Sequence, residues 1–221
     1  MREIDLDALL PRIRDALFET AVMVSISFVL ASVVGVLLGL LLYASRPGNL
    51  LANRATFGIL NGVINVVRPV PFLIVAVSVI PLTRLLVGSS IGPVAATVPL
   101  VLVASVAIAR IAESNLVAVD PGAIEAGTAM GATPWQVLFT VVVPEALGPL
   151  VLGLTYIFVA LIDATAVAGV LGGGGLGDLA IRYGYQRFDW FVVGVIVVLL
   201  VVLVQGAQLL GNSVARRVMH A

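Results

Sequence analysis

Residues 123–147, AIEAGTAMGATPWQVLFTVVVPEAL, form a glycine-punctuated segment between two long apolar runs. Asp120-Pro121, just ahead of it, is a favourable helix start, because a carboxylate cap precedes a proline at the first helical position. Gly131 suits the left-handed conformation that commonly ends a helix, and Thr133-Pro134 repeats the start signal. The segment predicts two short helices joined at Gly131, the second ending at Pro144, and neither is long enough to cross a bilayer.

The runs on either side predict an integral membrane protein. The chain has 221 residues, of which 61% are hydrophobic and 11% charged, and soluble domains average about 25% charged residues. We therefore expect an all-α, polytopic membrane protein with a single domain over residues 1–221. The five expected spans cover residues 20–43, 58–82, 93–111, 145–171 and 190–210, and the segment at 113–144 connects the third to the fourth.

Several classes of function are excluded by composition. The chain has no cysteine, so neither disulfides nor thiol chemistry are available. Its twelve basic residues balance twelve acidic ones, which gives no indication of a nucleic-acid partner. No nucleophile–base pair and no cluster of metal ligands is apparent, and His220 stands alone in the tail. We expect no catalytic residue, no metal, no cofactor and no removed signal peptide.

The second expected span is irregular. It contains Asn61 and Asn65 and then the sequence RPVP at residues 68–71, where two prolines remove backbone donors and predict a kink or break. A broken helix is tolerated in lipid only where protein or a water-filled cavity covers the freed groups. We therefore expect this element to face the interior, with Arg68 and Pro71 as candidate pathway residues, although Arg68 near a span end also suits snorkelling or lipid phosphate.

The remaining segments have simpler interpretations. Residues 1–19 predict an amphipathic helix at the membrane interface, and TRLLVGSSIGP at 83–93 predicts a short loop. GGGGLG at 172–177 lacks the strand and lysine of a P-loop. It predicts a flexible outer loop or close helix packing, followed by a polar loop to Asp189. An aromatic belt is predicted from Tyr183, Tyr185, Phe188 and Trp190.

The register of the opening segment resembles a known motif. Glu125-Ala126-Gly127, then Gly131, Val141 and Pro144 resemble the EAA loop, roughly E-A-A-x3-G-x9-I-x-L-P, of permease subunits of bacterial ABC importers. Gly127 and Val143 depart from that motif but stay small or apolar. The resemblance implies that the loop forms coupling helices on a partner ATPase, with Glu125 available for polar contact, small Ala126 and Gly127 permitting close approach, and Gly131 making the turn.

Other stretches narrow the resemblance. RPVPFLIV, GSSIG, VPL and GGGGLGDLAIRYGYQRFD, together with five spans, are similar to the methionine-type ABC importer permease, over residues from about 18 to 217. This implies an ABC type I importer permease fold with a cytoplasmic coupling loop. The implied partners are a second copy of the chain, an ATPase dimer that binds ATP, an extracytoplasmic solute-binding protein and membrane lipid. It also implies the bacterial inner membrane, with the N-terminus outside and the C-terminus cytoplasmic, an orientation that arginine counting leaves undecided.

Asp163 is the unusual residue of the fourth span. It lies roughly 28 Å along a helix from Pro144, near the outer edge of the hydrocarbon core, so it either lines a pore or sits in interfacial water beside an arginine. The candidate pathway residues of this span are Thr155, Val159, Ile162 and Ala166, which share one face, with Asp163 and Val167 beside them. The family has uncharged residues at this point, and an acid there favours a cationic over an anionic cargo.

These observations favour an ATP-driven importer permease for methionine or a related small amino-acid-like solute. The first alternative is a permease of the same superfamily that carries another polar amino acid or an organic cation, which Asp163 supports. A secondary transporter or small channel without an ATPase leaves the EAA-like register unexplained, and a purely structural scaffold would transport nothing.

Overall fold

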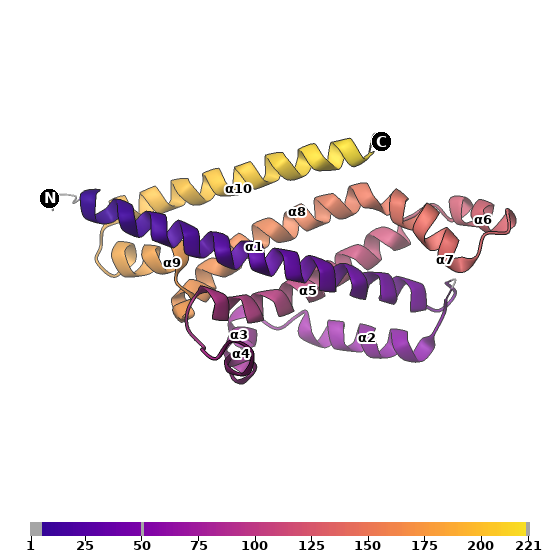
Figure 1. Cartoon of the computed structure of the whole chain (residues 1–221), viewed down its shortest axis with the longest axis horizontal. Coiled ribbons are helices and arrows are strands. Elements are labelled where there is room, and N and C mark those ends of the chain that lie inside the picture. The colour runs from indigo at the N-terminus through magenta and orange to yellow at the C-terminus, as the bar shows by residue number, and fades with distance from the viewer. Residues whose placement is uncertain (1–5, 50, 220–221) are drawn as a thin grey trace. The chain divides into compact units, whose positions relative to one another are not determined.

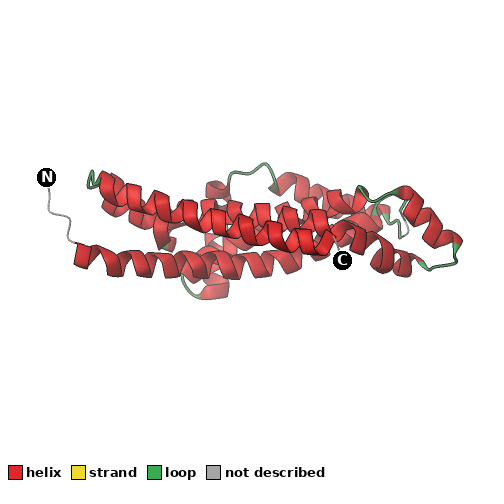
Figure 2. Ribbon diagram, turned by 90° about the horizontal axis from the view of Figure 1, so that it is seen from above, coloured by secondary structure: helices red, strands yellow, loops and turns green. Residues whose placement is uncertain are grey.

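The computed structural model describes residues 6–49 and 51–219, and in that part of the chain every regular element is a helix (Figure 2). His220 and the first five residues of the predicted interfacial helix lie outside it. Among the described residues, four helical stretches are long and apolar enough to cross a membrane. They correspond to α1 (Leu6–Ser45) from Leu9 onward, α5 (Pro93–Val117), the stretch that includes α8 (Val143–Ala168), and α10 (Trp190–Met219) (Figure 1). A fifth span results if α2 (Arg54–Val67) and α3 (Phe72–Ser78) are taken together as one bent pair. The all-α membrane fold is therefore as predicted.

The chain divides into two compact units. Unit 1 contains the described part of residues 1–29 with Pro71–Val103 and Phe158–Ala207. Unit 2 contains Leu30–Val70, Ala104–Ile157 and Gln208–Ala221. Each unit therefore gathers segments that are far apart in the sequence.

The core of unit 1 joins the start of α1 to α9 (Gly175–Leu179) and the start of α10. Its buried residues are Leu9, Ala16, Leu176, Leu179, Val192 and Ile196. Ile13 and Leu17 pack against them, so the apolar face of this segment contacts helices of the same chain. The predicted helix is present as the start of α1, which continues without a break from Leu6 to Ser45. Its place at the membrane interface stays a prediction.

The glycine-rich segment of unit 1 is closely packed. Gly172, inside the short π-helix η2 (Gly169–Gly173), has φ of 99°. A Cβ on Gly177 would collide with the backbone of Ala166 in α8, so only glycine permits this approach. Of the two interpretations given to GGGGLG, the structure shows close packing. The polar loop predicted up to Asp189 is also wrong, because α9 and the π-helix η3 (Ala180–Tyr185) make it helical through Tyr185.

The second expected span is broken where RPVP predicted a break. α2 ends at Val67, and Pro71 is the N-cap of α3, with φ of −56° and ψ of 138°. A further helix, α4 (Ile80–Val87), follows α3 and ends at Gly88, whose φ is 80°. The predicted loop at 83–93 is therefore too long. Pro81 lies in the first turn of α4, where proline is compatible with helix, and the loop begins only at Gly88.

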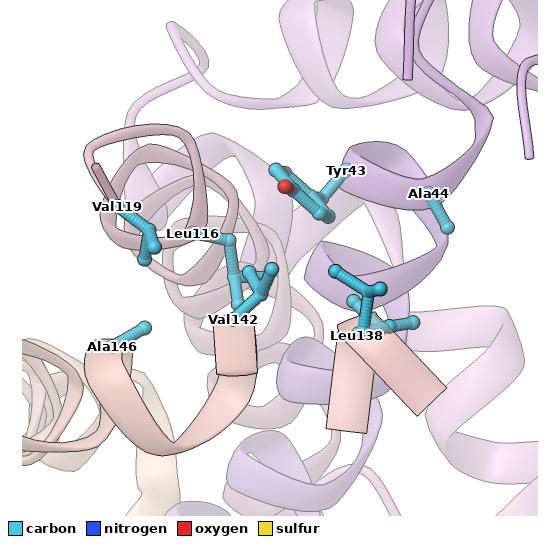
Figure 3. Close-up of a cluster of buried hydrophobic side chains, with 8 residues drawn as sticks. Tyr43, Ala44, Leu116, Val119, Leu138, Val142 and Ala146 are labelled. Carbon is cyan, nitrogen blue, oxygen red and sulfur yellow. The ribbon is translucent and has the colours of Figure 1, made fainter. Parts of the chain in front are cut away.

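Unit 2 is built on close contact between α1 and α5. A Cβ on Gly35 would lie 2.6 Å from Ile108 Cβ, so the two backbones approach more closely than larger residues allow. One buried cluster combines Leu42, Ile64 and Ala109. A second cluster joins the ends of α1 and α5 to the segment that follows α5 (Figure 3), and its residues are Tyr43, Ala44, Leu116, Val119, Val137, Leu138, Val142 and Ala146.

Candidate functional site

The segment between α5 and α8 begins with a capped helix, α6 (Pro121–Ala129). The Gly122 amide donates to Asp120 Oδ1 at 2.9 Å, and Pro121 occupies the first turn. At the other end, Ala132 N donates to Gly127 O at 3.3 Å and Gly131 N to Thr128 O at 3.0 Å. These two bonds form a Schellman motif around Gly131, whose φ is 82°. The predicted start and the predicted glycine stop are both present.

The second helix, α7 (Pro134–Val137), starts with a reciprocal cap. The Gln136 amide donates to Thr133 Oγ1 at 3.4 Å, and the Thr133 amide donates to Gln136 Oε1 at 2.8 Å. Together the two bonds form a capping box, which satisfies donors at both ends of the first turn. The segment therefore holds its conformation with side chains only a few residues apart.

The predicted end of this helix at Pro144 is wrong. α7 passes into a π-helix, η1 (Leu138–Val142), and then without interruption into α8, so that helix continues from Pro134 to Ala168. The Val143 amide donates to Leu138 O, five residues back. This wider turn directly precedes Pro144, which has no amide hydrogen to donate, and π-turns of this kind accommodate such a local mismatch within a helix.

The surface of the segment combines one acid with exposed apolar side chains. Glu125 and Ala126 are exposed. Met130 is 83% exposed, and Trp135 and Phe139 are more than half exposed and stack on each other with ring centroids 6.0 Å apart. We call Met130, Trp135 and Phe139 the apolar face of the segment. Exposed aromatic residues of this kind are enriched where proteins bind other proteins.

Gly127 and Pro144 take different places. Gly127 is buried, and a Cβ there would lie 3.5 Å from Val137 and 3.6 Å from Val141, an ordinary contact distance. The small residue therefore lets α6 pack on the helix that follows, and alanine would also fit. Pro144 is exposed in the first turn of α8.

A polar network in unit 2 lies just ahead of the segment. Glu113, 5% exposed, forms an ion pair with Arg110 and a longer one, at 3.8 Å, with Arg46. The second terminal nitrogen of Arg110 donates to Asn61 Oδ1 at 2.8 Å and to Asn65 Oδ1 at 2.7 Å. Because charged hydrogen bonds are strong where water is scarce, this network holds α5 against α1 and α2.

The predicted pathway residues separate into two groups. Thr155 abuts Gly211 of α10 within unit 2, Ile162 is 2% exposed, and Ala166 packs against Gly177 within unit 1. Val159 is intermediate in exposure, whereas Asp163 and Val167 are exposed. Asp163 forms no ion pair with any described residue. The shared face predicted for this helix therefore packs against the chain itself, and the exposed face lies one step around it.

Arg68 and Pro71, at the break between α2 and α3, are both exposed. No ion pair of Arg68 occurs among the described residues. Their part in a pathway stays a prediction.

Comparisons with known proteins assign the chain to a family. Residues 31–218 match the family described as "Binding-protein-dependent transport system inner membrane component". The chain belongs to this permease family. It is 43% identical over 205 residues to the probable D-methionine transport system permease protein MetI of Vibrio cholerae, covering 93% of this chain and 91% of the relative. It is 39% identical over 174 residues to the methionine import system permease protein MetP of Bacillus subtilis, covering 79% and 78%.

Solved structures of transporters have the same fold as this permease. A chain of the MetNI methionine ABC transporter, in inward-facing conformations, superposes with a TM-score of 0.92 at 38% identity, covering 99% of each chain. An amino acid ABC transporter with histidines superposes with a TM-score of 0.81 at 20% identity, covering 98% of this permease and 99% of that chain, which shows the fold alone.

Sequence reasoning missed two parts of the site. The apolar face could have been predicted, because Trp135 and Phe139 are aromatic residues four positions apart and so share one side of a helix. The polar network could not have been predicted from the sequence. Its residues Asn61, Arg110 and Glu113 come from two helices, and only the fold shows that these helices pack together.

Proposed function

We propose that this permease is the membrane-spanning subunit of an ATP-driven importer for methionine or a related small amino-acid-like solute. Its relatives in Vibrio cholerae and Bacillus subtilis are named for methionine transport, and they match over most of the chain. A solute-binding protein outside the membrane delivers the solute, and an ATPase partner supplies the energy, since this chain carries no P-loop.

The observation that carries the coupling mechanism is the continuous helix from Pro134 to Ala168. Its first turn belongs to the segment with the exposed Glu125 and the apolar face, and the rest of it forms an expected membrane span. A partner ATPase that binds the apolar face thereby acts on the first turns of the helix that becomes this span. The capping box at Thr133 and the Schellman motif at Gly131 keep that end folded without the partner.

The arrangement in the membrane follows from the same assignment. We call the segment between α5 and α8 the coupling segment. If it docks on a cytoplasmic ATPase, the N-terminus lies outside the bacterial inner membrane and the C-terminus lies in the cytoplasm. Two copies of the chain form the pathway. The exposed face of α8 supports that arrangement because it is available to a second copy, and its residues are Tyr156, Ala160, Asp163 and Val167.

The test compares charge reversal and truncation on the coupling segment with a matched control. We expect Glu125→Arg combined with Trp135→Ala to weaken binding of the purified ATPase about a hundredfold, because central aromatic and charged contacts dominate such interfaces. ATP-driven methionine uptake into proteoliposomes should fall with it. Asp15→Arg reverses the charge of another exposed carboxylate, outside the coupling segment. It should leave ATPase binding and methionine uptake unchanged.

Two results would contradict the proposal. Uptake that persists without ATP would indicate a secondary transporter. If an organic cation inhibits uptake and methionine does not, the substrate is a cation, as Asp163 suggests, and not methionine.

A further inference from the structure

A small cavity lies in unit 1, between α3, α4, the start of α5 and η2. It has a volume of about 80 Å³, and its walls are mainly small apolar residues, among them Ala76, Ala96 and Pro99. Liquid water occupies about 30 Å³ per molecule, so this space suits an apolar group of roughly three or four heavy atoms. An aromatic side chain is larger than this volume.

Hydroxyl groups are the polar part of the lining. Thr83 and Ser90 both line the cavity. The Thr83 hydroxyl donates to Val79 O at 3.0 Å, which uses its only proton within α4. Ser90 Oγ instead accepts from Arg84 Nε at 3.3 Å, so its own proton remains available to a ligand.

Arg84 adds a positive charge beside Ser90. Its side chain is exposed, and it forms no ion pair with any described carboxylate. Its two terminal nitrogens are the groups that bind a carboxylate in bidentate fashion. Arg84 does not itself line the cavity, but its bond to Ser90 places a guanidinium next to a hydroxyl donor of the lining. The two groups together are complementary to a carboxylate.

We propose that this cavity is a substrate site of the permease, which takes the side chain of a short aliphatic or thioether amino acid while Arg84 and Ser90 bind its carboxylate. This inference rests on the proposed function, because it identifies where that importer's own solute binds. Asp163 does not line the cavity. The charge beside the bound solute is thus positive, and the site selects a carboxylate and not an organic cation.

The test measures equilibrium binding of radiolabelled methionine to the full chain with its ATPase partner in nanodiscs, without the binding protein. Norleucine, which replaces sulfur with a methylene, should compete about as well as methionine, since both chains are unbranched. Methioninamide, which lacks the negative charge, should compete at least about tenfold more weakly. Phenylalanine, whose aromatic side chain is larger than the cavity, should compete poorly.

Two variants address the two halves of the site. Arg84→Gln should raise the Kd for methionine about tenfold or more and remove the discrimination against methioninamide, because it deletes the charge at an exposed position. Ala76→Val should raise the Kd for methionine and norleucine but keep that discrimination, because it narrows the cavity only. Arg187→Gln, which removes another exposed guanidinium of unit 1, should bind methionine as the wild type does.

The inference is overturned if the wild-type complex binds no methionine, or if Arg84→Gln binds methionine and methioninamide as the wild type does. It is also overturned if phenylalanine competes as well as norleucine. ATP-driven methionine uptake, measured in parallel with the binding protein present, reports on the proposed function separately. Normal uptake with unaltered binding in Arg84→Gln disproves this site alone, whereas absent uptake in the wild type disproves the function.

Discussion

Two glycine-punctuated segments of this permease are stabilised in opposite ways. The coupling segment is capped by its own neighbours, with Asp120 bonded to Gly122 and Thr133 bonded to Gln136. The segment around α9 is capped from a distance, because the amide of Gly175 donates to Glu19 Oε2 at 2.6 Å. The comparison teaches that an exposed segment can be held by residues only a few positions apart, whereas one buried in the core depends on tertiary contacts.

The glycines show the same contrast. A Cβ on Gly131 would meet nothing within 4 Å, so glycine is needed there only for its positive φ. A Cβ on Gly177 would collide with the backbone of Ala166, so glycine is needed there for space. Loss of either glycine therefore reports on a different physical constraint.

The largest effect is expected at the packed glycine. Gly177→Ala should lower the free energy of unfolding by about 3 kcal/mol, because the added methyl group meets backbone that cannot move without shifting α8. Unfolding by denaturant titration in mixed micelles measures the change. Gly194→Ala in α10, where a Cβ meets open space, is the control and should not destabilise the protein. Equal loss in both variants would show that crowding at Gly177 is not the reason.

An intermediate effect is expected at the long-range cap. Glu19→Ala should lower the free energy of unfolding by about 2 kcal/mol, because it leaves the amide of Gly175 without its charged acceptor. The same titration measures it, and hydrogen exchange at residues 174–177 should accelerate. Asp15→Ala, which removes an exposed carboxylate paired with Arg14, should change neither quantity. If hydrogen exchange at residues 174–177 is unchanged in Glu19→Ala, the segment around α9 is stabilised by its own local contacts, as the coupling segment is.

The smallest effect is expected in the locally capped segment. Gly131→Ala should lower the free energy of unfolding by about 1 kcal/mol, the penalty for a side chain in the left-handed conformation. Gly62→Ala, in open space within α2, serves as the control and should show no loss. A loss in Gly131→Ala as large as that in Gly177→Ala would end the distinction between the two segments, because it would place Gly131 in a packed contact.

Local signals made part of the fold predictable. Asp120-Pro121, Gly131 and Thr133-Pro134 act on residues within one or two turns, so their effect can be read from adjacent letters. The break at RPVP is predictable for the same reason, since proline acts on its own backbone. By contrast, Pro144 was predicted to end a helix, but the π-turn before it accommodates a residue without a backbone donor. No neighbouring residue in the sequence indicates this π-turn.

The rest depended on which segments meet in space. The N-terminal part of α1 has the pattern of an interfacial helix, but Leu176 and Ile196 bury its apolar face. The proposed role of Arg84 is likewise invisible in the sequence, because it depends on the bond to Ser90 and on a cavity whose walls come from five helices. Pairings of this kind require long-range contacts that a single sequence does not specify.

By itself the sequence determined that the chain spans a membrane, where its helices start near capped positions, and which permease family its motifs resemble. Composition and local backbone preference suffice for these, because both act residue by residue. Only the tertiary structure decided that Gly127 packs inside the coupling segment while Trp135 is exposed, and that Glu19 caps α9. Burial and partnership are properties of contacts between segments, and those contacts exist only in the folded chain.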